Sequence, residues 1–151
     1  KVEWTTIFFF GGLFILVGAL VNIGLIDFLG EKLLNVTNGD IPVTTILVLW
    51  MSSILSSFLD NIPYVATMIP LIHSISEGSV VAYEPVWWAL SIGACLGGNG
   101  TIIGASANVV SRGIAEKKGF KIGFGYYFKI AFPLMILSIA ISTVYLLIFY
   151  V

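Results

Sequence analysis

The stretch Ser56–Pro70, SSFLDNIPYVATMIP, places an aspartate, an asparagine and a proline inside an apolar run. The cores of soluble proteins avoid an unpaired carboxylate, and the interior of a bilayer disfavours such a group even more strongly. How Asp60 is accommodated therefore depends on which solvent surrounds the chain.

The composition indicates a membrane protein. Of the 151 residues, 58% are hydrophobic and only 10% are charged, whereas a soluble domain has about 25% charged residues. The mean hydropathy is +1.04. Residues 7–26 and 131–151 are apolar runs of about the length that crosses roughly 30 Å of hydrocarbon. We therefore expect an all-α integral membrane protein with membrane lipid around it and no nucleic-acid partner.

The basic residues predict the orientation of the chain. Five of the seven fall within residues 112–129, and lysine- and arginine-rich loops stay in the cytoplasm. The loop Ser76–Glu84 has two glutamates and no basic residue, so we expect it outside. The segment between the first helix and this loop must then enter and leave on the outer side. A prokaryotic plasma membrane is the expected location.

The predicted layout is one membrane repeat in which interrupted segments alternate with full spans. Irregular backbone survives at membrane depth only where protein or a water-filled cavity pairs its polar groups, so the two interruptions indicate a site. The expected elements are a full helix (4–28), a re-entrant helical hairpin (43–75), a broken transmembrane helix (86–114) and a second full helix (126–151), all within a single repeat, 1–151.

The turn of the hairpin is predicted to bind an ion. Ser53, Ser56, Ser57 and Asp60 recur at three- and four-residue spacing and so line one face of the incoming arm. This arm ends near Asp60 with its partial negative charge and free carbonyls, which can ligate a cation. Asn61 is expected to cap the second arm.

The carboxylate of Asp60 has two interpretations. An ionised aspartate at the bilayer centre costs about 2.5–3.5 kcal/mol, so it must be protonated, paired with a cation or hydrated. The alternative is that Asp60 only caps the second arm. We favour binding of a coupling ion, either a proton or sodium, with no other cofactor; the expected sodium ligands are Ser56, Asp60, Asn61 and Asn99.

The second interruption is the glycine-rich stretch Cys95–Val110, CLGGNGTIIGASANVV. Glycines stop a helix and let backbone approach a ligand closely, although in membrane helices they also serve close helix packing. The stretch lacks the spacing of nucleotide-binding loops. Gly97, Gly98 and Gly100 surround Asn99; Asn99 and Asn108 supply amides and Ser106 a hydroxyl, and Thr101 can cap a resumed helix.

An enzymatic function is not expected. An intramembrane aspartyl protease needs two carboxylates that share a proton, and Asp27 and Asp40 lie at the predicted membrane edges. The single histidine, His73, falls near the outer end of the second arm. The single cysteine, Cys95, excludes an internal disulfide.

The two interruptions together carry a family likeness. SSFLDNIPYVATMIPLI, followed by GACLGGNGTIIGASANVVSRGIAEKKGF, closely resembles the C-terminal repeat of the ArsB/NhaD arsenite permease and sodium–proton antiporter branch of the ion transporter superfamily, with its P-protein-like, citrate-transporter-like domains. The likeness runs from Val2 to the C-terminus. It implies two inverted repeats with substrate and coupling ion between them. The implied hairpin-tip contacts are Ser56, Ser57, Asp60 and Asn61, and the implied broken-helix contacts are residues 97–101, Ser106 and Asn108.

The resemblance implies a proton- or sodium-coupled secondary transporter of an inorganic or small organic anion such as arsenite. A sodium–proton antiporter of the same fold and a channel-like or non-transporting membrane subunit remain alternatives. Because the chain holds one repeat, we expect an N-terminal inverted repeat, or a second copy, to complete the site, and a homodimer overall. No arginine or lysine lies at the predicted midplane, which disfavours citrate-like substrates.

Overall fold

The computed structural model describes residues 4–76 and 82–151, apart from the side chains of residues 5, 6 and 10. In these ranges the chain is helical and contains no strand, so the predicted all-α membrane class is confirmed. The predicted outer loop, residues 76–84, lies largely outside the described ranges. The helices are α1 (Trp4–Asn22), α2 (Leu25–Thr37), α3 (Ile41–Phe58), α4 (Asn61–Ser76), α5 (Glu84–Gly97), α6 (Ser106–Lys117) and α7 (Phe124–Phe149).

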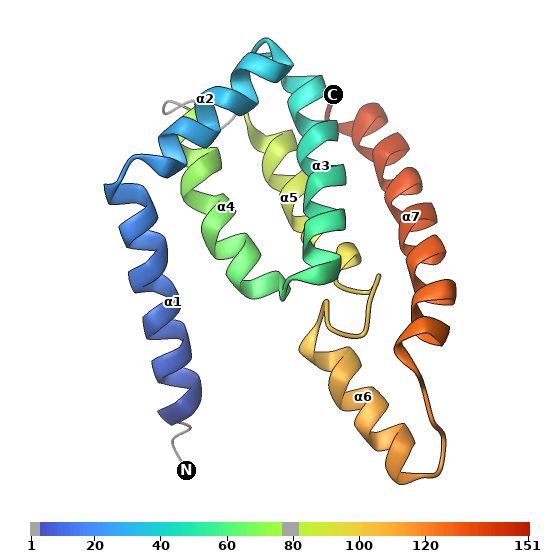
Figure 1. Ribbon diagram of the computed structural model, residues 1–151. Helices are drawn as coiled ribbons and strands as arrows, with labels where there is room; N and C mark the ends of the chain where they lie inside the picture. The colour runs from blue at the N-terminus through green and yellow to red at the C-terminus, as the bar shows by residue number, and fades with distance from the viewer. Residues whose placement is uncertain (1–3, 77–81) are drawn as a thin grey trace.

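The helices run between two ends of the molecule, as Figure 1 shows. α1 leads to the upper end in this view, and α2 lies across that end. α3 descends from it and α4 returns to it, so the two form a hairpin whose tip lies partway down the molecule. α5 also descends, the chain is interrupted beside the hairpin tip, and α6 continues to the lower end. α7 then runs back to the upper end.

Length and hydropathy identify the segments that can cross a bilayer. Among the described residues, α3 (18 residues) and α7 (26 residues) are each long and apolar enough to span. The helical segments 7–22 and 25–37 would form a third span if they were counted as one helix, although their axes differ by 66° at the break between them. α3 does not continue across, because the chain turns at Leu59 and α4 returns alongside.

The predicted single helix over residues 4–28 is wrong in its extent. α1 ends at Asn22, and Gly24 adopts the left-handed conformation (φ 73°), which a residue with a side chain rarely does. α2, which was not predicted from the sequence, then begins at a new angle. α2 buries Ile26 while exposing Asp27 and Glu31, as expected of an amphipathic helix lying at the membrane surface.

The centre of the fold is the contact between α3 and α5. These two helices pack together more extensively than any other pair among the described elements. A Cβ placed on Gly93 would lie 2.6 Å from the carbonyl oxygen of Leu49, and one on Gly97 would lie 2.6 Å from the Cα of Ser53. The facing serines of α3 are fully buried. Small residues thus allow the two backbones to touch, as in many membrane helix pairs.

Other helices are fixed to this pair by polar contacts. The indole nitrogen of Trp50 on α3 donates to the hydroxyl of Thr143 on α7 at 3.1 Å. The hydroxyls of Ser52 on α3 and Tyr64 on α4 are 3.0 Å apart. Both arms of the hairpin are therefore joined to the centre of the fold.

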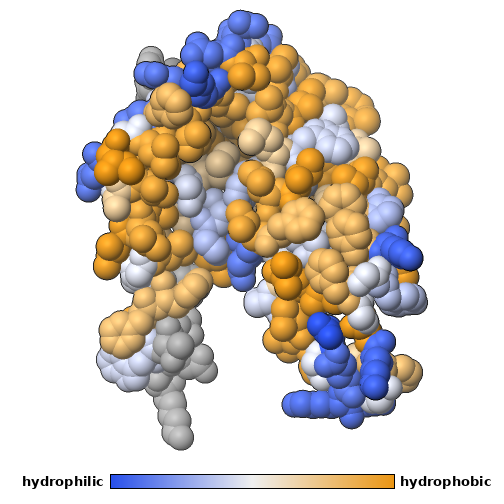
Figure 2. Space-filling model, viewed as in Figure 1, coloured by the Kyte–Doolittle hydropathy of each residue, from blue (hydrophilic) through white to orange (hydrophobic). Residues whose placement is uncertain are grey.

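The outer surface matches a membrane environment. Figure 2 shows hydrophobic residues over the sides of the molecule and hydrophilic residues at its upper and lower ends. α7 exposes large apolar side chains along its length, among them Leu134, Ile141 and Ile148. Such a surface is stable in lipid, where apolar side chains incur no hydration cost.

The packing of α3 on α5 generates a stability prediction. Gly97→Ala would force the two backbones apart, and overpacking of this kind costs about 1–3 kcal/mol. Gly113→Ala is the matched control, because Gly113 lies within α6 with nothing within 4 Å of its added Cβ. The control should gain about 0.5–1 kcal/mol from helix propensity. Thermal unfolding of both variants in detergent measures the difference; equal melting temperatures would contradict the close contact.

Candidate functional site

The tip of the hairpin and the glycine-rich interruption pack directly against each other. The hydroxyl of Thr101 donates a hydrogen bond to the carbonyl oxygen of Ser57. A Cβ on Gly100 would lie 2.9 Å from the Cβ of Ser57, and one on Gly104 would lie 3.0 Å from the carbonyl oxygen of Ser56. The two interruptions, more than 40 residues apart in the sequence, therefore form one structural unit.

Side chains supply the hydrogen bonds that the interrupted helix lacks. The amide nitrogen of Asn108 donates to the carbonyl oxygens of Gly98 at 2.9 Å and Thr101 at 3.0 Å. The Thr101 hydroxyl also accepts from the backbone N–H of Gly104 at 3.1 Å. Backbone polar groups at membrane depth need such partners. Asn108 and Thr101 thus hold the shape of the interruption.

Neighbouring helices add two further hydrogen bonds to this unit. The hydroxyl of Ser56 donates to the carbonyl oxygen of Ala94 on α5 at 2.8 Å. The hydroxyl of Tyr127 on α7 donates to the carbonyl oxygen of Asn99 at 3.2 Å. α3, α5 and α7 therefore all contribute to the position of the interruption (Figure 1).

Asp60, and not Asn61, caps the second arm of the hairpin. A carboxylate oxygen of Asp60 accepts a hydrogen bond from the backbone N–H of Ile62 at 3.2 Å. The backbone carbonyl oxygen of Asp60 accepts another from the backbone N–H of Tyr64 at 3.4 Å. Asn61 is already the first residue of α4. The predicted cap at Asn61 is wrong by one position, because the aspartate at the turn is an equally good capping residue and lies where the first free N–H groups point.

The predicted contact residues divide by exposure. Asn99 and Ser106 are exposed, whereas Asp60, Asn61 and Asn108 are half-buried. The remaining predicted residues are buried in the contact between tip and interruption; they are Ser56, Ser57, Gly97, Gly98, Gly100, Thr101. The glycines have ordinary backbone angles, so close packing rather than left-handed geometry requires them.

The side chains that remain open lie at the surface beside this packed unit. Of the four predicted sodium ligands, Asp60 and Asn61 are half-buried and Asn99 is exposed, while Ser56 is buried and donates to the carbonyl oxygen of Ala94. No cluster of three or more His, Cys, Asp or Glu side chains occurs in the part of the chain that the structure describes. Any cation here would depend on hydroxyl, amide and carbonyl oxygens with one carboxylate.

Gly93 and Tyr127 also belong to this arrangement, although neither was predicted from the sequence. Gly93 lies four residues before Gly97, so small-residue spacing on α5 could have indicated it. Tyr127 had no comparable signal, because its contact with Asn99 depends on how α7 returns past the interruption.

Comparison with known proteins identifies the family. The profile described as CitMHS, citrate transporter, matches residues 1–93, which is more than half of the chain. The chain belongs to the CitMHS family. This is a family of transporters, which agrees with the expectation that the chain is not an enzyme. The profile match covers the hairpin and α5 as far as Gly93, while the last turn of α5 and the glycine-rich interruption lie beyond it.

Several relatives extend over the whole chain. P protein from Sus scrofa is 44% identical over 158 residues, covering 100% of this chain, and P protein from Homo sapiens is 43% identical over the same length. An uncharacterized transporter of Mycobacterium tuberculosis is 45% identical over 148 residues, covering 97% of the chain. Relatives of this CitMHS member thus occur in mammals and in bacteria.

The chain spans only part of these relatives, about 19% of the length of the P proteins and 34% of the mycobacterial transporter. These matches support the predicted membership of the ion transporter superfamily, because they place the chain in the CitMHS family. They do not show that the chain belongs to the narrower ArsB/NhaD branch.

The hydrogen bonds of the interruption generate a second prediction. Asn108→Ala removes the hydrogen bonds to the carbonyls of Gly98 and Thr101. The Thr101 carbonyl keeps the backbone N–H of Gly104 at 3.4 Å, but the buried carbonyl of Gly98 loses its side-chain donor, which costs about 1–3 kcal/mol. Asn99→Ala is the control, because the Asn99 side chain is exposed and the hydrogen bonds to Leu96 and Tyr127 use the backbone of Asn99; the stability of this variant should change by no more than about 0.5 kcal/mol. Thermal unfolding in detergent distinguishes them. A stable Asn108→Ala protein would contradict the role of Asn108.

Proposed function

We propose that the chain is one half of the core of a secondary transporter, in which a proton or sodium ion is coupled to movement of an anion. The observation that carries this proposal is the contact between the hairpin tip and the glycine-rich interruption, with open polar side chains beside it. The CitMHS family and the mycobacterial relatives named as transporters support transport as the activity.

Helix ends give this region its electrostatic character. α3 and α5 both end here with their C-termini, which carry partial negative charge, and α4 and α6 both begin here with their N-termini, which carry partial positive charge. The first pair favours a cation, and the second pair favours an anion. In this proposal Asp60 binds the coupling ion together with Asn61, Asn99 and a lone pair of Ser56.

The proposed substrate is an inorganic or small organic anion of low charge, such as arsenite or a related oxyanion. Among the described residues no lysine or arginine lies in the interruption. The basic residue nearest to it in sequence is Arg112, which follows the first residue of α6, Ser106, by six positions. A multivalent carboxylate such as citrate, which the family description names, would need positive charge from elsewhere in the protein. We retain the ArsB/NhaD branch as the proposed subfamily on the strength of the motifs around Asp60 and Gly97–Gly100.

The proposed partner is a second repeat that covers the open side of the site. Asn99 and Ser106 are exposed in this chain, and polar side chains at membrane depth lie against protein or water rather than lipid. An N-terminal inverted repeat of the same protein would cover them, or a second copy of this chain would; we propose a homodimer of the complete protein. Transport would follow from one unit moving against the other.

We place the basic loop, residues 112–129, in the cytoplasm, because five of the chain's seven basic residues lie there. A prokaryotic plasma membrane is the proposed location. Mammalian and bacterial relatives are both known, so localisation of the tagged protein in its own cell tests this point.

The substitution Asp60→Asn tests the role given to the carboxylate. Asparagine caps a helix as well as aspartate does, so stability should be kept while the titratable charge is lost. In proteoliposomes containing the complete protein, we expect flux driven by a sodium or proton gradient to fall at least about tenfold. Asp27→Asn is the matched control. Asp27 lies on α2 and accepts a hydrogen bond from Ser74, near the end of α4 that is far from Asp60, so this substitution should leave coupling unchanged.

The same proteoliposomes separate the alternatives. Arsenite, inorganic phosphate, succinate and citrate would be offered in turn, each with and without a sodium gradient. Sodium–proton exchange without any anion would indicate the antiporter, and single-channel currents would indicate a channel. Unchanged coupling in Asp60→Asn at every pH would show that Asp60 is only a helix cap.

A further inference from the structure

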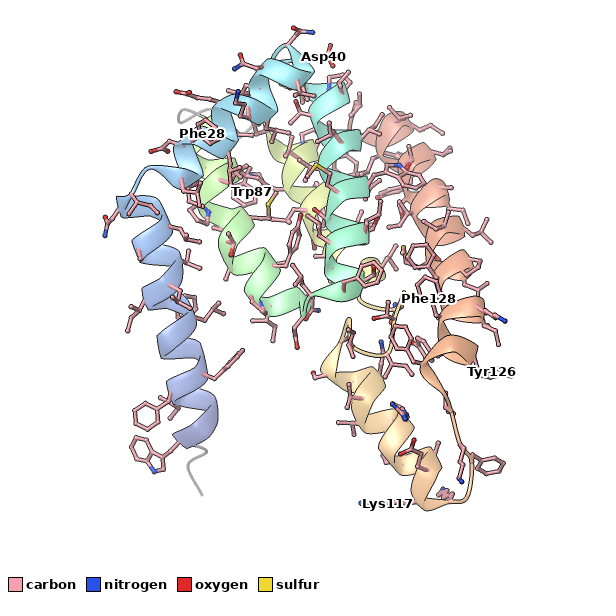
Figure 3. All side chains as sticks on the ribbon, in the orientation of Figure 1. Phe28, Asp40, Trp87, Lys117, Tyr126 and Phe128 are labelled. Atoms are coloured by element: carbon pink, nitrogen blue, oxygen red, sulfur yellow. The ribbon has the colours of Figure 1, made fainter. Side chains whose placement is uncertain are left out.

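One end of the molecule concentrates positive charge beyond what the transport site uses. This basic end, residues 112–129, holds five basic side chains and one acidic side chain, a formal charge of +4. Figure 2 shows it as a hydrophilic region at the lower end of the molecule, next to hydrophobic surface. Figure 3 places Lys117 at its outermost point.

The length of α7 sets the depth of the basic end in the membrane. Its 26 residues, at about 1.5 Å each, make a helix of about 39 Å, whereas the hydrocarbon layer is about 30 Å thick. Residues 130–149 carry no charge and fill that layer. Lys129 therefore lies at the boundary, and the residues before it lie among the lipid headgroups.

Aromatic side chains mark the same level. Tyr126 is 68% exposed, and tyrosine prefers the headgroup region; Phe120 within the basic end is also exposed. On α7 the ring of Phe128 stacks on Phe124 at 6.1 Å and on Phe132 at 4.7 Å, and Figure 3 shows Tyr126 and Phe128 above Lys117. The basic side chains and this aromatic column thus occupy adjoining layers.

A pocket opens within the basic end. The last turns of α6 and residues 121–123 border an open hollow of about 510 Å³, lined among others by Arg112, Glu116 and Lys121. The Nε of Arg112 donates to Glu116 at 2.9 Å, which leaves the two terminal guanidinium nitrogens free to donate to another anion. Lys117, Lys118 and Lys121 are exposed. The charge of Glu116 is thus engaged while three lysines remain available.

We infer that the basic end binds the phosphate headgroup of an anionic phospholipid. Arg112 and Lys121 line the pocket that takes the phosphate, Lys117 and Lys118 add charge beside it, and the exposed apolar side chains of α6, Val110 and Ile114 among them, are positioned to contact the acyl chains. Clusters of four to eight basic residues next to a membrane helix attract anionic lipids, with about 1 kcal/mol for each. The upper end carries three acidic residues, Asp27, Glu31 and Asp40, against one lysine, Lys32, so it lacks such a cluster of positive charge.

The experiment measures lipid binding by native mass spectrometry. The complete protein, delipidated in a neutral detergent, is titrated with palmitoyl-oleoyl phosphatidylglycerol and with the matching phosphatidylcholine. We expect phosphatidylglycerol to bind preferentially, and the triple variant Lys117→Gln, Lys118→Gln, Lys121→Gln to lose that preference by about fivefold for each lysine removed. Lys32→Gln, at the other end of the molecule, should keep it.

Three outcomes overturn the inference. The triple variant could retain the full preference, Lys32→Gln could lose it equally, or inorganic phosphate at millimolar concentration could displace the lipid completely, which would assign the pocket to a soluble anion. Circular dichroism checks that the triple variant is folded, and the single variant Lys121→Gln, expected to lose about fivefold, serves if it is not. The result does not depend on the transport proposal, because binding is measured without flux.

Discussion

The close approach of α3 and α5 is the contact on which the rest of the structure depends. Serines on one helix and glycines on the other let the backbones touch, and the same contact continues into the glycine-rich interruption at Gly100 and Gly104. In hydrocarbon, a chain can leave helical geometry only where other groups pair its backbone. Here hydroxyls and amides from Ser56, Thr101 and Asn108 do so. The turn at Asp60 can therefore exist beside a second break.

This arrangement gives the two arms of the hairpin different neighbours. α3 is packed on α5 and joined to α7 through Trp50, whereas α4 is joined to α2 by the hydrogen bond from Ser74 to Asp27, 2.6 Å long. The two arms also contact each other, because the hydroxyls of Ser52 and Tyr64 are 3.0 Å apart, and α4 packs against α5 as well. Under the proposed function, an ion held by Asp60 would contact the turn between the two arms. That position suits a residue whose protonation or ion binding must influence the movement of whole helices.

The sequence predicted the parts of this fold that follow from hydropathy and from conspicuous interruptions. The membrane class, the turn at Asp60 and the break near Gly97 all stand out in apolar surroundings. α2 was missed because its mixed polar and apolar pattern does not continue the preceding apolar run, and the cap was placed one residue late because Asp60 and Asn61 are chemically equivalent for that task. The contacts of Gly93 with Leu49 and of Tyr127 with Asn99 depend on how distant helices pack, which no local pattern specifies.

The most direct test of the central claim is a cross-link between the two interruptions. In the complete protein with Cys95→Ser, cysteines at positions 57 and 100 would be oxidised within native membranes, and disulfide formation measured by mobility after cleavage between α4 and α5. A Cβ at Gly100 would lie 2.9 Å from the Cβ of Ser57, which is shorter than the roughly 3.5–4.5 Å between the Cβ atoms of a disulfide, so a small outward shift of the two segments brings the pair into bonding range. We expect nearly complete cross-linking, and none for a control pair at positions 57 and 114. Absence of the 57–100 cross-link would show that the hairpin tip and the glycine-rich break do not meet.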